Sequence, residues 1–80
     1  MRMFMEQNKV TATFDDGKEY RVKSIEMYDG HTTAEVWMEA TDGSGDEEWF
    51  VWYFMDETLI DSILGNDFDN VVYNDKTYHK

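Results

Sequence analysis

Residues 32–54 read TTAEVWMEATDGSGDEEWFVWYF and contain two apolar runs, which a polar turn with two glycines separates. The first run alternates, which is the period of a β-strand with one buried face. The residues on its apolar face are Ala34, Val36, Met38 and Ala40. The second run, 48–54, is apolar at every position after Glu48, so we expect it to be the most buried strand. The Asp42-Gly43 pair between the runs predicts an antiparallel hairpin.

Two more Asp-Gly pairs, Asp16-Gly17 and Asp29-Gly30, precede this hairpin at intervals of thirteen residues. Because both central residues of a type I′ turn need positive φ, Asp-Gly pairs between alternating runs predict tight hairpins. The runs that they separate predict strands over 9–14 and over 20–27. In the second of these strands the alternation slips at Lys23-Ser24, where we expect a β-bulge.

From Asp56 to Gly65 the apolar period is that of a helix, with Asp56 as the expected N-cap and Gly65 as the expected C′ residue. The apolar stripe consists of Leu59, Ile60, Ile63 and Leu64. A helix this short is unstable alone, so it must pack on the sheet. Beyond it, residues 70–73 and 76–79 predict a last hairpin around Asn74-Asp75.

These elements predict a single α+β domain over residues 1–80. We expect a four- to five-stranded antiparallel meander, either open or curled toward a small barrel, with one short helix after the fourth strand. A chain of this length buries only about 60% of the surface that its unfolded form exposes, so it needs a rich core. Aromatic residues make up 16% of the chain and hydrophobic residues 41%, which is typical of a folded protein despite a net charge of -11.

The charge is distributed unevenly along the chain. Fourteen of the 18 Asp and Glu residues lie between Ser24 and Asp75, whereas all 7 Lys and Arg residues lie outside that window. Such acidity disfavours direct binding to nucleic acid or to an anionic membrane, and it favours a basic partner. Two interpretations stay open: a carboxylate-rich binding face, or a surface that is acidic only because it is solvated.

Three groups of carboxylates are expected to be neighbours. Glu35 and Glu39 share a strand face, and Glu57 and Asp61 share a helix face at i,i+4. The loop group consists of Asp42, Asp46, Glu47 and Glu48. We predict that these eight carboxylates contribute to a partner-binding surface.

Trp37 and Trp52 are the candidate anchors of that surface, since tryptophan often dominates the energy of a protein interface. Trp37 lies between Glu35 and Glu39 on its strand face. It is either an exposed anchor or part of a second small core inside a curled sheet. Trp52 belongs to the aromatic run, one face of which must be covered by chain ends, by a second copy or by a target.

The sequence contains no recognisable catalytic or metal site. Asp42, Ser44 and Asp46 have the spacing of the first calcium ligands of an EF-hand, but Glu47 replaces its required Gly and Tyr53 its bidentate Glu. A calcium-binding module is therefore only a weak alternative. With no cysteine, no Ser-His pattern and no glycine-rich phosphate loop, we expect no enzymatic activity and no cofactor.

Residues 1–10 lack the apolar stretch of a signal peptide, and the longest apolar run, 49–55, is too short to span a bilayer. We therefore expect a soluble intracellular protein that does not bind membranes.

In size, acidity and lack of cysteine and of catalytic residues, the chain resembles small inhibitor proteins that bacteriophages and mobile elements encode. This group includes the uracil-DNA glycosylase inhibitor, the anti-restriction proteins and several anti-CRISPR proteins. The resemblance involves no shared motif, so no residue carries over. It implies a non-catalytic inhibitor in the bacterial cytoplasm, whose acidic, DNA-mimic-like surface blocks the nucleic-acid-binding site of a basic host defence or DNA-processing protein. The alternative is a homodimeric structural or accessory assembly protein that pairs through its aromatic strand.

Overall fold

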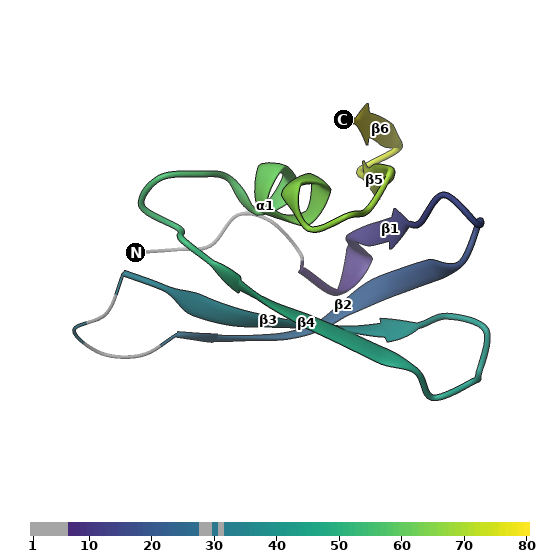
Figure 1. Cartoon of the computed structure of the whole chain (residues 1–80), viewed down its shortest axis with the longest axis horizontal. Helices are drawn as coiled ribbons and strands as arrows, with labels where there is room; N and C mark the ends of the chain where they lie inside the picture. The colour runs from purple at the N-terminus through teal and green to yellow at the C-terminus, as the bar shows by residue number, and fades with distance from the viewer. Residues whose placement is uncertain (1–6, 28–29, 31) are drawn as a thin grey trace.

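The computed structural model describes residues 7–27, 30 and 32–80, in which six strands and one short α-helix form an α+β domain (Figure 1). In chain order the elements are a 3-10 turn at Gln7–Lys9, β1 (Thr11–Thr13), β2 (Glu19–Met27), β3 (Ala34–Ala40), β4 (Glu47–Trp52), α1 (Leu59–Gly65), β5 (Asn70–Tyr73) and β6 (Lys76–His79). The predicted α+β class is confirmed. The predicted count of four to five strands is wrong, because the last hairpin joins the same sheet.

The strand order in this sheet is β4-β3-β2-β1-β5-β6, and all neighbours are antiparallel. The first four strands form the predicted meander, and β5 pairs with β1 so that Val71 lies opposite Ala12. Among the described residues β4 and β6 remain as two separate edges, so of the two predicted alternatives the sheet is the open one and not a curled barrel. Figure 1 shows β2, β3 and β4 as a lower layer, with α1, β1 and the β5–β6 hairpin above it.

The hydrophobic core lies between these two layers. Val36 and Met38 on β3 and Ile63 on α1 are each 0% exposed. Phe68, which follows the helix, is also buried and stacks on Phe14 with ring centroids 4.2 Å apart. The predicted apolar faces of β3 and α1 are thereby confirmed, and the opposite face of the β2–β3–β4 layer is not required for the core.

The predicted bulge in β2 is present. The register of β2 against β3 shifts between Val22 and Ser24, so that Ser24 rather than Lys23 lies opposite Trp37. Val22 is buried in the core, whereas Lys23 and Ser24 both line a pocket beside Trp37. The bulge therefore directs two consecutive polar side chains to the face away from the core.

The hairpin turns differ from the predicted type. At Asp16-Gly17 and at Asp42-Gly43 the glycine has positive φ, 88° and 83°, but the aspartate does not, so these are not type I′ turns. The amide of Gly17 donates to the carbonyl of Phe14, which closes a turn inside a three-residue loop. In the Asp29-Gly30 pair, Asp29 lies outside the described residues. The predicted last hairpin is present, and it is this turn that has the positive φ values of type I′, 55° at Asn74 and 62° at Asp75.

The prediction that β4 is the most buried strand is wrong. β4 lies at the edge of the sheet, beside β3 alone among the described strands. Phe50 and Trp52 face the core, whereas Trp49 is 55% exposed and Val51 is 39% exposed. A run that is apolar on both faces fits a central strand, but it also fits an edge strand with an exposed apolar face.

Both predicted ends of the helix are wrong. Thr58 is the N-cap, because its hydroxyl oxygen accepts a hydrogen bond from the backbone N–H of Asp61 at 3.1 Å. Asp56 belongs instead to the preceding turn. Gly65 is the last helical residue rather than the C′ residue, and the left-handed conformation occurs at Asp67, with a φ of 75°.

Candidate protein-binding surface

The β2–β3–β4 layer has an outer face, which points away from the core. β3 contributes Trp37 at its centre, and the cross-strand partners of Trp37 are Ser24 on β2 and Trp49 on β4. The bulge adds Lys23 to the same face. The remaining outer-face residues follow from the registers and are Arg21, Glu26, Glu35, Glu39, Glu47 and Val51.

Trp37 and Trp49 form the apolar centre of the outer face. Their rings are stacked, with centroids 5.8 Å apart and planes inclined by 22°. The indole N–H of Trp37 donates to Oε1 of Glu35 at 3.2 Å. Trp37 is half-buried by its neighbours, whereas Trp49 and Val51 beside it are exposed. Two large rings that the core does not use are therefore presented to solvent.

Carboxylates surround this pair, and several of them lie opposite one another. Glu26 on β2 is the cross-strand partner of Glu35, and Glu39 on β3 is the partner of Glu47. Like charges at directly opposed positions destabilise a sheet, by an amount on the order of tenths of a kcal/mol per pair. Arg21 on β2, the other partner of Glu39, supplies a compensating cation on the same face.

Lys23 supplies the second cation. Its ammonium donates to Oε2 of Glu47 at 2.7 Å, which links β2 to β4 across β3. This hydrogen bond to a carboxylate raises the pKa of Lys23 above its ordinary value. The window that lacks Lys and Arg in the sequence is therefore partly neutralised in space by two basic residues of β2.

A pocket of about 230 Å³ opens beside the tryptophan pair. Its lining consists of Lys23, Ser24, Glu26, Trp37 and Glu47. An indole ring, two carboxylates, a hydroxyl and an ammonium group thus meet in one small space. The bulge is the reason that Lys23 and Ser24 reach it together.

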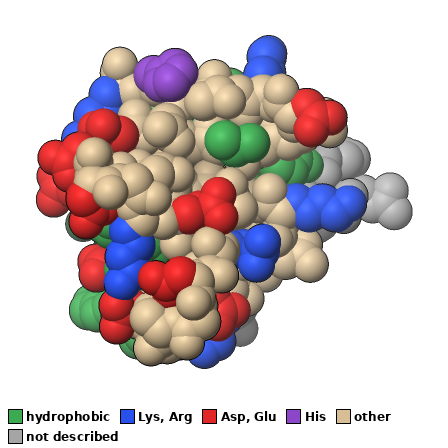
Figure 2. Space-filling view, turned by 90° about the vertical axis from the view of Figure 1, so that its right-hand side faces the viewer, with side chains coloured by type: hydrophobic (Ala, Val, Ile, Leu, Met, Phe, Trp, Pro, Cys, Tyr) green, Lys and Arg blue, Asp and Glu red, His purple; other side chains and the backbone are tan. Residues whose placement is uncertain are grey.

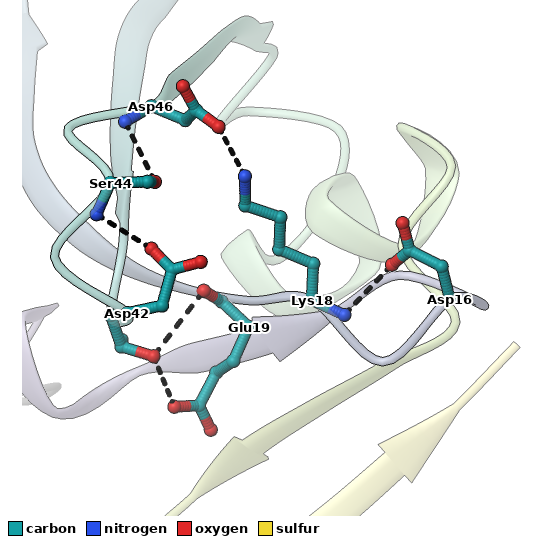
Figure 3. Close-up of polar contacts among 7 residues, drawn as sticks. Asp16, Lys18, Glu19, Asp42, Ser44 and Asp46 are labelled. Carbon is teal, nitrogen blue, oxygen red and sulfur yellow. Dashed lines mark hydrogen bonds and ion pairs between the residues drawn. The ribbon is translucent and has the colours of Figure 1, made fainter.

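The loop between β3 and β4 is held by its own hydrogen bonds (Figure 3). The backbone N–H of Ser44 donates to Oδ1 of Asp42 at 2.9 Å, and the hydroxyl of Ser44 accepts from the backbone N–H of Asp46 at 3.2 Å. Hydrogen bonding by Ser44 lowers the pKa of Asp42 below its ordinary value. The carboxylate of Asp46 pairs with the ammonium of Lys18, which raises the pKa of Lys18.

This arrangement accounts for the calcium-like spacing of the loop without a metal. Asp42 and Asp46 are engaged by donors of the chain itself, as Figure 3 shows. Within residues 7–27, 30 and 32–80, no group of three or more His, Cys, Asp or Glu side chains is placed to hold a metal ion. The loop is thus a stable hairpin connection that adds carboxylates to one end of the outer face.

The structure brings some of the predicted site residues together and separates others. Glu35, Trp37, Glu39 and Glu47 share the outer face, and Asp42 and Asp46 lie in the loop at its end. Glu48 is exposed but lies at a core-facing position, opposite Met38.

Trp52, Glu57 and Asp61 lie on the other side of the sheet. Trp52 is 8% exposed, and its indole N–H donates to the backbone carbonyl of Glu57 at 2.8 Å. Asp61 is exposed on α1, whose apolar stripe packs on the core-facing side of the layer. The three predicted carboxylate groups therefore do not converge around Trp37.

Sequence reasoning missed several outer-face residues: Arg21, Lys23, Ser24, Glu26, Trp49 and Val51. The alternation of β2 indicates which of its residues point outward, and the slip at Lys23-Ser24 indicates the bulge. Which strands flank Trp37 depends instead on pairing between distant segments, which local sequence does not show. Figure 2 shows acidic and basic side chains interleaved on one side of the molecule rather than one continuous acidic face.

No helix among the described residues is long and apolar enough to cross a membrane. Comparisons with protein-family models, curated proteins and solved structures found no match to this chain. What the chain does must therefore be inferred from its surface.

Proposed function

We propose that this chain is a non-catalytic inhibitory binding protein of a phage or mobile element, which docks on the nucleic-acid-binding site of a basic host defence or DNA-processing protein. The observation that carries the proposal is the stacked Trp37–Trp49 pair on a sheet face that the core does not use, where Trp37 is half-buried and Trp49 is exposed. Interfaces have large aromatic anchors at their centre and a charged rim, and the outer face has this layout.

The charge of the rim favours a basic partner. Indole rings attract Lys and Arg side chains through cation–π interactions, and the carboxylates beside them accept charge-assisted hydrogen bonds from the same groups. The net charge of -11 would also accelerate the encounter with a positively charged surface. Both effects weaken as salt screens the charges.

The outer face would imitate a few phosphates of a nucleic acid rather than a whole stretch of its backbone. Arg21 and Lys23 offset part of the charge of Glu26, Glu35, Glu39 and Glu47. The outer face therefore does not reproduce the regular charge of a duplex backbone, which carries one charge per about 1.7 Å. Instead, a few carboxylates around two rings would occupy the positions that bind phosphates in the partner.

Two charge-matched variants test this proposal. Glu35→Gln/Glu39→Gln removes two charges from the outer face, and Glu57→Gln/Asp61→Asn removes two charges from the helix side. In affinity capture from a bacterial lysate, we expect the wild-type chain and the helix-side variant to retain the same nucleic-acid-binding protein. The outer-face variant should retain much less of it, and high salt should release it.

The proposal is wrong if both double variants capture the protein equally well, or if the captured protein stays bound at high salt and has no nucleic-acid site. All four substituted side chains are exposed or half-buried, so we expect both variants to fold. Circular dichroism of the two variants checks this.

One observation favours a second candidate function, a homodimeric assembly protein. β4 is an edge strand that exposes Trp49 and Val51, and Tyr53 directly after it is exposed as well. Such an edge can pair with another strand. Light scattering at two concentrations separates the candidates. A mass that doubles with concentration, and that Trp49→Ala returns to the monomer value, supports assembly; a constant monomer mass eliminates it.

A further inference from the structure

The pocket at the β2 bulge has the size and lining of a site for one side chain. Pockets that enclose a whole small ligand have volumes of roughly 300–1,000 Å³, and this one has about 230 Å³. Trp37 of the stacked tryptophan pair forms part of its lining, so a partner that covers the rings also covers the pocket. What enters it would be part of that partner.

The chemistry of the lining selects among side chains. Trp37 offers an aromatic surface, and Glu26 and Glu47 offer carboxylate oxygens around the same space. A guanidinium group is planar, stacks on aromatic rings and donates two parallel hydrogen bonds to one carboxylate. An ammonium group is a compact, strongly hydrated charge that does neither of these as well. The pocket therefore fits arginine better than lysine.

The chain already places a cation against one of these carboxylates. The ammonium of Lys23 donates to Oε2 of Glu47 at 2.7 Å. The Lys23 side chain is 50% exposed and the Glu47 side chain is 39% exposed. Exposed ion pairs of this kind are weak, so an incoming group with better geometry can replace Lys23. The bulge places Lys23 in the pocket, where its ammonium competes with an incoming cation for the carboxylate of Glu47.

We propose that the pocket receives one arginine side chain of a basic partner, which stacks on Trp37 and displaces Lys23 from Glu47. This inference rests on the proposed function for the existence of the partner and adds the residue chemistry of the contact. It predicts that replacing Lys23 strengthens binding, because the incoming arginine then has no ammonium to displace from Glu47.

An octa-arginine peptide and an octa-lysine peptide of equal charge are suitable probes. In two-dimensional NMR at physiological salt, we expect octa-arginine to shift the indole N–H signals of Trp37 and Trp49. The signal of Trp52 should stay in place, since its N–H is bound to a backbone carbonyl on the other side of the sheet. Octa-lysine should bind more weakly and shift the Trp37 signal less.

Lys23→Gln should raise the affinity for octa-arginine about threefold, by removing a competing ion pair of ordinary surface strength. Lys76→Gln is the matched control, because it makes the same change in net charge at β6, the opposite edge of the sheet. In a double-mutant cycle, the gain from Lys23→Gln should largely disappear when Glu47→Gln is also present. That result separates competition for Glu47 from a simple loss of repulsion.

Equal binding of the two peptides, together with equal effects of Lys23→Gln and Lys76→Gln, would overturn the arginine site. A gain from Lys23→Gln that survives in the Glu47→Gln background would overturn the competition. Neither result depends on a captured host protein, so the arginine site can fail while the proposed function stands. Conversely, the chain could bind octa-arginine selectively while the captured partner has no nucleic-acid site. That result would contradict the proposed function and support the arginine site.

Discussion

The ammonium of Lys23 on β2 lies 2.7 Å from a carboxylate oxygen of Glu47 on β4, so one ion pair spans the strand that carries Trp37. The two residues are separated by 24 positions in the sequence. Their contact shows how the fold redistributes charge: a segment without basic residues lies beside a strand that supplies them. It also fixes one wall of the pocket at the outer face.

Stability at high pH should depend on this pair. Because the pKa of Lys23 is raised in the folded state, its contribution is fully present below the ordinary lysine pKa and is lost as the pH rises through the folded value. Urea unfolding of the wild type and Lys23→Gln from about pH 8 to about pH 12 measures this contribution. We expect a stability difference that is constant at first and then shrinks above about pH 10. A difference that persists to the highest pH would show that the charged ammonium is not its cause.

The two tryptophans of β4 should differ in their effect on stability. Trp52 is buried and hydrogen-bonded, so Trp52→Ala should cost about 3–5 kcal/mol in the free energy of unfolding. Trp49 is 55% exposed and mainly stacks on Trp37, so Trp49→Ala should cost about 1 kcal/mol. Urea denaturation measures both values. Equal costs would contradict the assignment of the two rings to opposite faces.

One substitution should have opposite effects in two hairpin turns. Asp75 has a φ of 62°, which glycine adopts without strain, so Asp75→Gly should stabilise the domain by up to about 1 kcal/mol. Asp16 does not have positive φ, and its carboxylate accepts from the backbone N–H of Lys18 at 2.8 Å. Asp16→Gly should therefore destabilise by about 1 kcal/mol. Thermal unfolding of the two variants tests the signs, and a change in the same direction would refute the assigned turn geometries.

Local patterns predicted the elements of this fold well. The alternation of Ala34, Val36 and Met38 gave the buried face of β3, and the slip at Lys23-Ser24 gave the bulge. The hairpin around Asn74-Asp75 also has the predicted bounds. Each of these features depends on residues that are close together in the chain.

The features that sequence reasoning missed depend on contacts between distant segments. The pairing of β5 with β1 adds strands to the sheet and is not visible in either strand alone. The edge position of β4 leaves Trp49 exposed, although its run resembles a central strand. The position of α1 over the core-facing side carries Asp61 away from Trp37. The site was therefore predicted in part, through Trp37 and the strand carboxylates, while its basic residues and its pocket were not.

If the outer face occupies a nucleic-acid-binding site, the chain and nucleic acid must compete for the partner. The protein captured from lysate is loaded with fluorescent duplex DNA, and the anisotropy is followed as the chain is added. The wild type should displace the DNA, Glu57→Gln/Asp61→Asn should displace it equally well, and Trp37→Ala/Trp49→Ala should fail at the same concentrations. If the wild-type chain binds while the DNA stays bound in a ternary complex, the outer face does not occupy the nucleic-acid-binding site.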